Sequence, residues 1–321
     1  ILIELGPVYV KLGQLLSTRP DLLPGEYIEE LSTLQDDVPP VPWSEIDVMI
    51  RQQLKQPLEE TFATINLQPV AAGSIAQTHR ATLANGREVA LKVQRPGIDA
   101  IVARDISLIK GVADLVALTE FGQDYDIRSL AEEFSTALEA ELDFSREAGF
   151  TDQLRRNLSS SRWFDPSQLV VPEIFWDLTT EKLLVMEWMD GVPLLSAPVI
   201  YEENNGNGTV AILTPERRQE ITTLLFRAFF QQLYIDGFFH ADPHPGNLFY
   251  LKDGRVALLD CGMVGRLDPR TQRILTEMIL AIVDLDAQRC AQLTLQLAEF
   301  TKSTSVSRLE NDYDRMLRKY Y

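Results

Sequence analysis

The feature that most constrains this chain is a polar loop between a long apolar stretch and a short apolar strand. Residues 240–247 read HADPHPGN, and two prolines with a glycine exclude a continuous helix there. The preceding stretch, residues 221–239, is apolar but interrupted by Arg227 and Asp236, which predicts a buried helix. A strand–turn–strand over residues 247–260 follows, with Asp253-Gly254 in its turn. The chain must therefore fold so that polar groups gather where these buried elements end.

Three side chains of this region carry the chemistry that phosphoryl transfer requires. That reaction needs cations that hold phosphates, ligands that hold metal ions, and a carboxylate near the acceptor. Asp242 and Asn247 are five residues apart in the loop, and Asp260 follows at the end of the next strand. We predict that Asp242 faces the acceptor and that Asn247 and Asp260 hold Mg²⁺. Cys261, directly after Asp260, is expected to be a packing residue.

A lysine on a predicted strand supplies the cation. Residues 76–83 and 88–94 form a hairpin pattern around Asn85-Gly86, a dipeptide that type I′ turns favour. Lys92 lies on the second strand between apolar neighbours, and Glu147, on a following helical stretch, is its candidate partner. Taken alone, Lys92 would be interpreted as a strand lysine that faces solvent.

The order of the remaining patterns predicts an α+β protein with two lobes. Strands dominate from residue 69 and helices after residue 215, and a nucleotide would bind between the lobes. We divide the chain into a helical extension, residues 1–65, a strand-rich lobe with inserted helices, residues 66–190, and a helical lobe with the polar loop, residues 191–321. The other expected elements are helices over residues 5–16, 44–54 with Ser44 as N-cap, 98–118, 127–158 and 215–236, a proline-rich connector over 38–42, strands over 170–176 and 182–188 that close the first lobe, and a polar surface loop over 190–213.

Charge and residue usage argue against several other classes of protein. The net charge of −17 opposes binding to nucleic-acid phosphates, and its simplest interpretation is solubility. Two cysteines cannot make a disulfide framework, and three scattered histidines do not make a metal cluster. No apolar run reaches the length of a membrane span, and the start shows no signal-peptide pattern. The chain starts with Ile rather than Met, so we expect the true N-terminus to lie upstream.

Three further motifs complete a pattern that resembles one protein family. Residues 11–14 read KLGQ, residues 71–76 read AAGSIA and residues 141–143 read ELD. With the loop at 240–247, they resemble the UbiB family of atypical kinase-like proteins, the aarF-domain-containing kinases, over most of the chain. The opening stretch is most similar to that of members from cyanobacteria and plastids. The resemblance implies a bilobal protein-kinase-like fold, an N-terminal helical extension that carries the Lys-x-Gly-Gln signature, and ATP and Mg²⁺ as cofactors.

The resemblance also assigns roles that position alone leaves open. It implies a regulatory signature of Lys11, Gln14, Glu141 and Asp143. In the family the signature lysine pairs with the first acidic residue, here Lys11 with Glu141, which would lay the opening helix across the place where a protein substrate docks. We expect Asp143 and Glu147 to share one helix face, with Glu141 about 120° away. Without the family pattern, Lys11 and Glu141 would be interpreted as solvated surface charges.

The same resemblance predicts how the nucleotide is held and where the chain departs from ordinary kinases. An alanine-rich loop replaces the kinase glycine-rich loop, so one glycine remains to let the backbone approach phosphates closely. Residues 186–189 resemble the hinge that holds adenine, although their side chains could equally be plain core. The segment after Asp260 is short and lacks Ala-Pro-Glu, which argues against ordinary protein phosphorylation. The predicted nucleotide contacts are Ala71, Ala72, Gly73, Ser74, Ile75, Ala76, Lys92, Glu187 and Met189.

The function that the resemblance implies is an ATPase or atypical phosphotransferase that supports isoprenoid-quinone or prenyl-lipid biosynthesis. Its predicted catalytic residues are Lys92, Glu147 and Asp242. Expected partners are ATP, a quinone precursor or other prenyl lipid, a membrane surface and proteins of a biosynthetic complex, but not nucleic acid. We expect a location peripheral to a membrane, on its cytoplasmic or organelle-stromal side. Two alternatives stay open: a small-molecule kinase of the choline or aminoglycoside type, and a pseudokinase scaffold that binds nucleotide without turnover.

Overall fold

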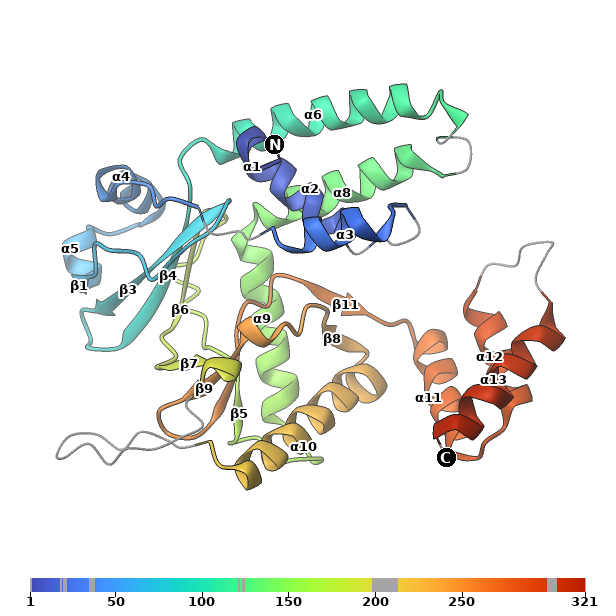
Figure 1. Ribbon diagram of the computed structural model, residues 1–321. Coiled ribbons are helices and arrows are strands. Elements are labelled where there is room, and N and C mark those ends of the chain that lie inside the picture. The colour runs from blue at the N-terminus through green and yellow to red at the C-terminus, as the bar shows by residue number, and fades with distance from the viewer. Residues whose placement is uncertain are drawn as a thin grey trace. The chain divides into compact units, whose positions relative to one another are not determined.

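The computed structural model describes residues 2–17, 19, 22–34, 38–120, 122, 125–197, 213–298 and 305–320. Its helices and strands pack into two units (Figure 1). The first unit comprises residues 1–152 and 172–189, and the second comprises residues 153–171 and 190–321. Helix α9 (Phe144–Ser159) begins in the first unit and ends in the second. The expected α+β class is confirmed, because both units combine helices with sheet.

An antiparallel sheet forms the centre of the first unit. Its strands follow the order β1-β3-β4-β6, and β2 pairs with β3. The expected hairpin between β3 and β4 is confirmed, but its turn is not type I′, because Gly86 is left-handed (φ +86°) and Asn85 is not. The strands of this sheet are β1 (Phe62–Ile65), β2 (Ala71–Ala72), β3 (Ala76–Leu83), β4 (Glu88–Gln94) and β6 (Leu183–Glu187).

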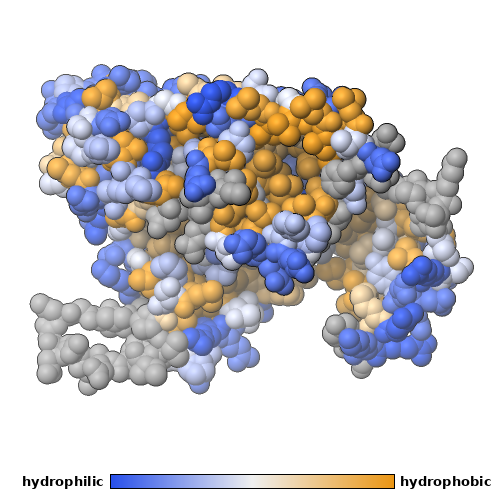
Figure 2. Space-filling model, turned by 45° about the horizontal axis from the view of Figure 1, so that its top comes forward, coloured by the Kyte–Doolittle hydropathy of each residue, from blue (hydrophilic) through white to orange (hydrophobic). Residues whose placement is uncertain are grey.

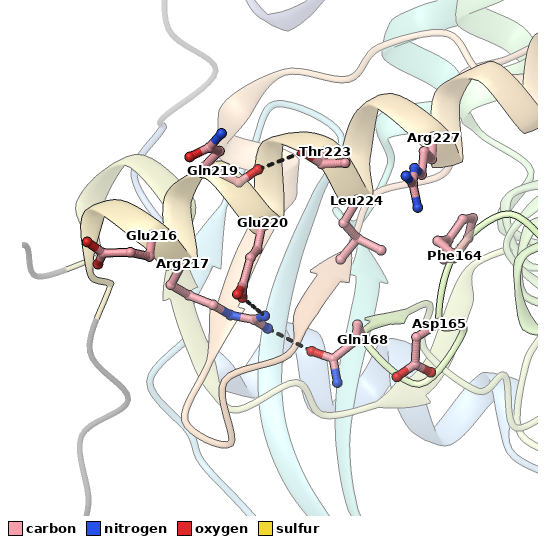
Figure 3. Close-up of a pocket in the computed structure, with 10 residues that line it drawn as sticks. All are labelled: Phe164, Asp165, Gln168, Glu216, Arg217, Gln219, Glu220, Thr223, Leu224 and Arg227. Atoms are coloured by element: carbon pink, nitrogen blue, oxygen red, sulfur yellow. Dashed lines mark hydrogen bonds and ion pairs between the residues drawn. The ribbon is translucent and has the colours of Figure 1, made fainter.

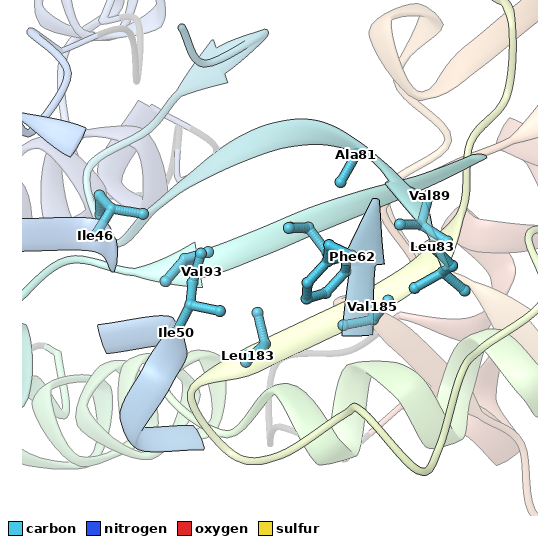
Figure 4. Packing of buried hydrophobic residues seen from close by; sticks show 10 residues of the cluster. Ile46, Ile50, Phe62, Ala81, Leu83, Val89, Val93, Leu183 and Val185 are labelled. Atoms are coloured by element: carbon cyan, nitrogen blue, oxygen red, sulfur yellow. The ribbon is translucent and has the colours of Figure 1, made fainter. Parts of the chain in front are cut away.

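Helix α4 (Trp43–Gln53) packs on this sheet through a cluster of buried apolar side chains (Figure 4). Ile46 and Ile50 lie one helical turn apart and are both fully buried, which gives α4 its inward face. The N-cap of α4 is Pro42 rather than Ser44, because Trp43 is already helical and the extended Pro42 (φ −55°, ψ 141°) ends the connector. The cluster contains Ile46, Ile50, Phe62, Ala81, Leu83, Val89, Leu91, Val93, Leu183 and Val185.

A second layer of helices completes the first unit. The signature helix α2 (Pro7–Ser17) contacts α6 (Ile98–Val116) and α8 (Ile127–Glu141). Val8 from α2 is buried in one cluster with apolar side chains of those two helices. The remaining elements of the unit are α1 (Leu2–Leu5), α3 (Gly25–Ser32) and α5 (Leu58–Thr61).

The predicted single helix over residues 127–158 is wrong, because the chain breaks between α8 and α9. Asp143 accepts a hydrogen bond from the Ser145 N–H (2.9 Å), as an N-cap side chain does, so it starts a new helix. Glu141 ends α8, Asp143 caps α9, and Glu147 lies within α9. The expectation that Asp143 and Glu147 share one helix face, with Glu141 farther around the same helix, is therefore also wrong.

The second unit contains two small sheets and a set of helices. One sheet has the order β5-β10-β9-β7, and the other pairs β11 with β8. β5 (Leu169–Val170) pairs in parallel with β10, so only the later part of the expected strand over 170–176 joins the first unit, where Ile174 pairs with Met186 of β6. Most of the expected surface loop over 190–213 lies outside the described residues, and its start forms β7. The other elements are η1 (Leu194–Ser196), α10 (Pro215–Gln231), the π-helical turn η2 (Gln232–Asp236), β7 (Gly191–Pro193), β8 (Phe238–His240), η3 (Pro245–Asn247), β9 (Leu248–Leu251), β10 (Val256–Leu258), β11 (Val264–Arg266), α11 (Pro269–Val283), α12 (Ala287–Leu297) and α13 (Val306–Tyr320).

The outer face of α6 is unusually apolar for a surface helix. Leu108, Val112, Leu115 and Leu118, in and just after this helix, are all more than half exposed. Figure 2 shows apolar residues on the molecular surface beside polar ones. Among the described residues, no helix is both long and apolar enough to cross a membrane.

Candidate functional site

The predicted ion pair between Lys92 and Glu147 is present in the first unit. Lys92 Nζ lies 2.9 Å from both carboxylate oxygens of Glu147, and the two side chains are 21% and 10% exposed. Strand β4 supplies the lysine and the first turns of α9 supply the glutamate. The ammonium group also lies 5.4 Å from the centre of the Phe144 ring. This arrangement holds a cation at a fixed, partly desolvated position.

The alanine-rich loop forms a tight link between β2 and β3. Ala71 and Ala72 pair with β3, and the Gly73 N–H donates to the Ala76 carbonyl (2.8 Å). Ser74 and Ile75 are buried, so their side chains pack into the unit. The loop is therefore held by main-chain hydrogen bonds and by the burial of Ser74 and Ile75.

The predicted hinge residues follow directly on the central sheet. Strand β6 ends at Glu187, whose carboxylate accepts a hydrogen bond from the Glu173 N–H (3.2 Å). The Trp188 N–H donates to the Glu88 carbonyl (3.1 Å), and Met189 is buried. The side chain of Glu187 thus has a structural contact, which leaves main-chain groups as the candidates for adenine recognition.

The signature residues of α2 contact two other elements of the first unit. Lys11 Nζ lies 3.1 Å from the carboxylate of Glu141 at the end of α8, and the two side chains are 25% and 34% exposed. The Gln14 amide donates to the Leu34 carbonyl just after α3 (3.3 Å). A methyl group on Gly13 would collide with the Leu34 side chain. Lys11 therefore contacts the end of α8, while Gly13 and Gln14 contact Leu34, just after α3.

His240 organises the polar loop of the second unit. Its ring is buried, and its Nε2 lies 3.0 Å from the Asp260 carbonyl, to which an Nε2–H donates. The Asp242 N–H donates to Nδ1 of the same ring (3.2 Å). The backbone of His240 is in turn held by the side-chain oxygen of Gln232 (2.9 Å). One imidazole thus fixes the spacing between the backbones of Asp242 and Asp260.

The two predicted metal ligands, Asn247 and Asp260, carry side-chain oxygens of the kind that bind Mg²⁺. The Asn247 amide donates through Nδ2 to the Asp242 carbonyl (3.2 Å), so Oδ1 is the atom that it can offer to a cation. Asp260 has a left-handed backbone (φ +49°), an uncommon and strained conformation that occurs often at functional sites. Among the described residues, no group of three or more His, Cys, Asp and Glu side chains forms a metal cluster. Mg²⁺ keeps several waters and uses few protein oxygens beside phosphates, so a pair of oxygen ligands suits it.

A separate cavity of about 550 Å³ lies along α10, over residues 216–227 (Figure 3). Arg217 spans it and donates to Glu220 (2.9 Å), Gln168 (2.7 Å) and the Gly254 carbonyl (2.8 Å). The Arg217 guanidinium therefore links α10 to the β9–β10 turn by a hydrogen bond. The cavity is lined by Phe164, Asp165, Gln168, Glu216, Arg217, Gln219, Glu220, Thr223, Leu224 and Arg227, and it contains no residue of the predicted site.

The predicted residues thus form separate groups in the two units. The first unit brings Lys92 to Glu147 and places the alanine-rich loop and hinge on one sheet. In the second unit His240 contacts the backbones of Asp242 and Asp260, and Asn247 contacts the Asp242 carbonyl. The sequence identified His240 only as part of a motif and did not reveal that its ring links the backbones of Asp242 and Asp260. It also did not reveal the role of Arg95, which binds the Gly73 carbonyl (2.7 Å). Its position directly after a strand and before a proline was the available signal.

Comparison with known proteins places this arrangement in a class. The chain matches the ABC1 atypical kinase-like domain over residues 33–294. A solved structure described as a complex of Rv3197 with erythromycin, from Mycobacterium tuberculosis, aligns with a TM-score of 0.65 and 27% identity, covering 96% of this chain and 73% of that one. The fold is therefore kinase-like. The chain belongs to the ABC1 atypical kinase-like family.

Individual relatives narrow this assignment. An uncharacterized protein of Synechocystis, slr0889, is 61% identical over the whole chain, which covers 77% of that protein. Proteins named "Probable protein kinase UbiB" from Marinobacter nauticus and Azotobacter vinelandii are 38% and 37% identical over 96% of the chain. The chain spans about half the length of these UbiB proteins (54% and 55%). The expected resemblance to UbiB proteins, with a cyanobacterial member among the relatives, is confirmed.

Proposed function

We propose that this chain is the Mg²⁺- and ATP-binding part of an atypical phosphotransferase or ATPase. The observation that carries the proposal is the ion pair in which both carboxylate oxygens of Glu147 lie 2.9 Å from Lys92 Nζ. A lysine held in this way on a central strand can neutralise nucleotide phosphates without rearrangement, which is the electrostatic preorganisation that phosphoryl transfer uses. The family match supports the kinase-like class.

The remaining residues would divide the work of the reaction. Asp242 would accept the proton of an acceptor hydroxyl or water as the bond from the terminal phosphorus to the bridging oxygen breaks and the bond to the acceptor oxygen forms. Asn247 and Asp260 would hold Mg²⁺, which when bound neutralises charge on the phosphate oxygens. His240 would keep these groups at fixed spacing through its two ring nitrogens. The alanine-rich loop and the main chain of residues 187–189 would contact the nucleotide.

Phosphate release from ATP tests this proposal. We expect slow Mg²⁺-dependent release by the wild-type chain, and a loss of about 10²-fold or more in the Asp242→Asn variant, because the proton acceptor is removed while the side chain keeps its shape. Asp253→Asn, which neutralises an exposed carboxylate of the β9–β10 turn, is the control and should retain full activity. Equal rates in Asp242→Asn and the control would refute the assignment of Asp242.

We further propose that the protein acts on, or in support of, isoprenoid-quinone or other prenyl-lipid metabolism at a membrane surface. The names of the UbiB relatives support this choice of pathway class. The four exposed apolar side chains on and after α6 are compatible with a lipid contact. ATP hydrolysis should therefore rise when a soluble quinone-precursor mimic or liposomes are added. A rate that neither addition changes would contradict this part of the proposal.

A small-molecule kinase is the second candidate. One observation favours it: the solved structure that aligns with this chain is described as a complex with erythromycin, a small molecule. The alanine-rich loop and the 11–14 signature argue against ordinary choline or aminoglycoside kinases. The two candidates differ in the fate of the terminal phosphate, so radiolabelled ATP with an aminoglycoside or choline acceptor separates them. Label on the added acceptor would favour the second candidate, and label only in inorganic phosphate would favour the first.

A further inference from the structure

One arginine holds the alanine-rich loop to a second, distant segment. The backbone N–H of Arg95 donates to the Ile75 carbonyl (2.9 Å), and its Nε donates to the Gly73 carbonyl (2.7 Å). A terminal nitrogen of the same guanidinium donates to the Pro39 carbonyl (2.8 Å). Gly73 and Pro39 lie 22 and 56 positions from Arg95 in sequence. A single side chain therefore bridges the loop and the proline-rich connector, residues 38–42.

The connector has further bonds to the same region. The Val38 N–H donates to the Ala72 carbonyl (3.2 Å) within the alanine-rich loop. The buried Gln77 side chain makes two hydrogen bonds with the backbone of Val41. Its Oε1 accepts from the Val41 N–H (2.8 Å), and its Nε2 donates to the Val41 carbonyl (3.3 Å). The connector lies within the helical extension, between α3 and α4, so these bonds attach this part of the extension to the sheet and the loop.

The chemistry of the contact requires an arginine. A planar guanidinium presents several N–H donors in fixed, diverging directions, whereas a lysine ammonium is a single point on a flexible stem. Holding the Gly73 carbonyl also orients the next peptide group, because a trans peptide is planar and its N–H points away from its C=O. Arg95 thus sets the direction of the Ser74 N–H, a main-chain donor of the loop.

We propose that Arg95 is a positioning residue that couples the N-terminal extension to the nucleotide loop. While the connector is seated, the guanidinium keeps the loop in one conformation that binds nucleotide. Release of the connector removes the guanidinium contact with the Pro39 carbonyl, loosens the loop and weakens nucleotide binding. The coupling of the two segments stands on the hydrogen bonds alone, and its effect on the nucleotide rests on the proposed function.

Hydrogen–deuterium exchange of the full chain without nucleotide tests the coupling. In Arg95→Ala we expect about tenfold faster exchange of amides in both 38–42 and 71–76, since hydrogen bonds to a charged donor are lost in each segment. Arg95→Lys should show a smaller change, because one carbonyl can keep a donor. The control is Arg87→Ala, which removes an exposed arginine of the β3–β4 hairpin paired with Glu173 (2.6 Å). Unchanged exchange in either segment of Arg95→Ala, or equal exchange in the control, would overturn the proposal.

A reciprocal variant perturbs the connector and leaves Arg95 in place. Val38→Pro removes the N–H that donates to the Ala72 carbonyl. We expect faster exchange over residues 71–76 in this variant, and less than the sum of the two single effects in the double variant with Arg95→Ala. Strictly additive effects would mean that the two contacts act independently, which contradicts the coupling. If Arg95→Ala does not fold, Arg95→Lys takes its place in this cycle.

The affinity for Mg-ATP then tests the second part of the proposal, the effect of Arg95 on nucleotide binding. We expect a dissociation constant raised about tenfold in Arg95→Ala and partly restored in Arg95→Lys. Reduced affinity with unchanged exchange would show that Arg95 contacts the nucleotide itself, which would overturn the positioning role. A wild-type chain that does not bind Mg-ATP would refute the proposed function, while the exchange data would still decide whether the extension and the loop are coupled.

Discussion

At the scale of single residues, two lysine–glutamate pairs of similar length differ in what they can contribute. Lys92–Glu147 (2.9 Å) is largely withdrawn from solvent, whereas Lys11–Glu141 (3.1 Å) is more exposed on both sides. Solvent-exposed pairs contribute little to stability, because water screens them and both side chains lose freedom. Loss of one partner from a desolvated pair costs more, since the remaining charge stays partly buried.

This contrast gives a prediction for two matched substitutions. Lys92→Met should lower the free energy of unfolding by about 1–3 kcal/mol, because Glu147 keeps its partly buried position without the lysine. Lys11→Met should lower it by less than about 1 kcal/mol. Urea unfolding at neutral pH measures both values. Losses of the same size in the two variants would show that burial does not distinguish the pairs.

A second residue-scale prediction concerns His79, which is fully buried on β3. Its ring nitrogens lie 2.8 Å from the Asn66 carbonyl and 2.8 Å from the Gln77 amide nitrogen, and its ring packs edge-on against Trp43. Burial lowers the pKa of His79 below its ordinary value, so the folded protein holds the ring neutral. The unfolded chain therefore binds this proton first as pH falls below about 6.5, and folding loses stability there.

The measurement is urea unfolding at pH 7.5 and pH 5.5 in the wild type and in His79→Gln. The wild type should lose more stability on acidification than the variant, by up to about 1.4 kcal/mol for this one-unit interval below 6.5. The variant removes the titrating group and isolates its share from that of other residues. An identical pH dependence in both proteins would contradict the role of His79.

At the scale of elements, local patterns predicted most of the fold and most of the candidate site. The β3–β4 hairpin, the proline-rich connector and the strand–turn–strand around Gly254 were predictable, because turn residues and alternating apolar residues are local signals. The polar side chains of the loop at 240–247 were predictable for the same reason, since the prolines fix where helices stop.

The errors came from tertiary context that one stretch of sequence does not contain. Residues 127–158 keep a helical apolar pattern across the break, and only the contact of Asp143 with Ser145 reveals a new start. β5 is two residues long, and pairing with β10, far along the chain, decides which unit it joins. Arg95 was missed because its place after a strand and before a proline does not reveal its partners, the Gly73 and Pro39 carbonyls, which belong to the backbone.

Asp143 carries the element-scale prediction. Its N-cap contact starts α9, the helix that brings Glu147 to Lys92. Asp143→Ala should therefore lower the free energy of unfolding by about 1 kcal/mol, while Asp143→Asn should stay near wild type because asparagine is an equally good N-cap. Thermal and urea unfolding measure this difference. If the asparagine variant loses as much as the alanine variant, the negative charge matters more than the cap.

At the scale of the whole molecule, the proposed activity requires both units. The first unit contributes the cation and the backbone loop, and the second contributes the carboxylates and the amide oxygen. Each set of residues was predicted from its own local motif. The contacts through which His240 links Asp242 and Asp260 were visible only in the folded structure. The relatives named UbiB are about twice as long as this chain, so partners and substrates of the whole protein belong to the proposal.

Isothermal titration of ATP into this chain, with and without Mg²⁺, tests the central claim most directly. We predict that the wild type binds ATP in the presence of Mg²⁺, and that Asp260→Asn weakens this binding at least about tenfold by removing a charged oxygen ligand. Asparagine tolerates the left-handed backbone at this position, so the loop keeps its shape, and Asp253→Asn should bind like the wild type. Mg-dependent binding that is as tight in Asp260→Asn as in the wild type would contradict the account, and so would a wild-type chain with no affinity for Mg-ATP.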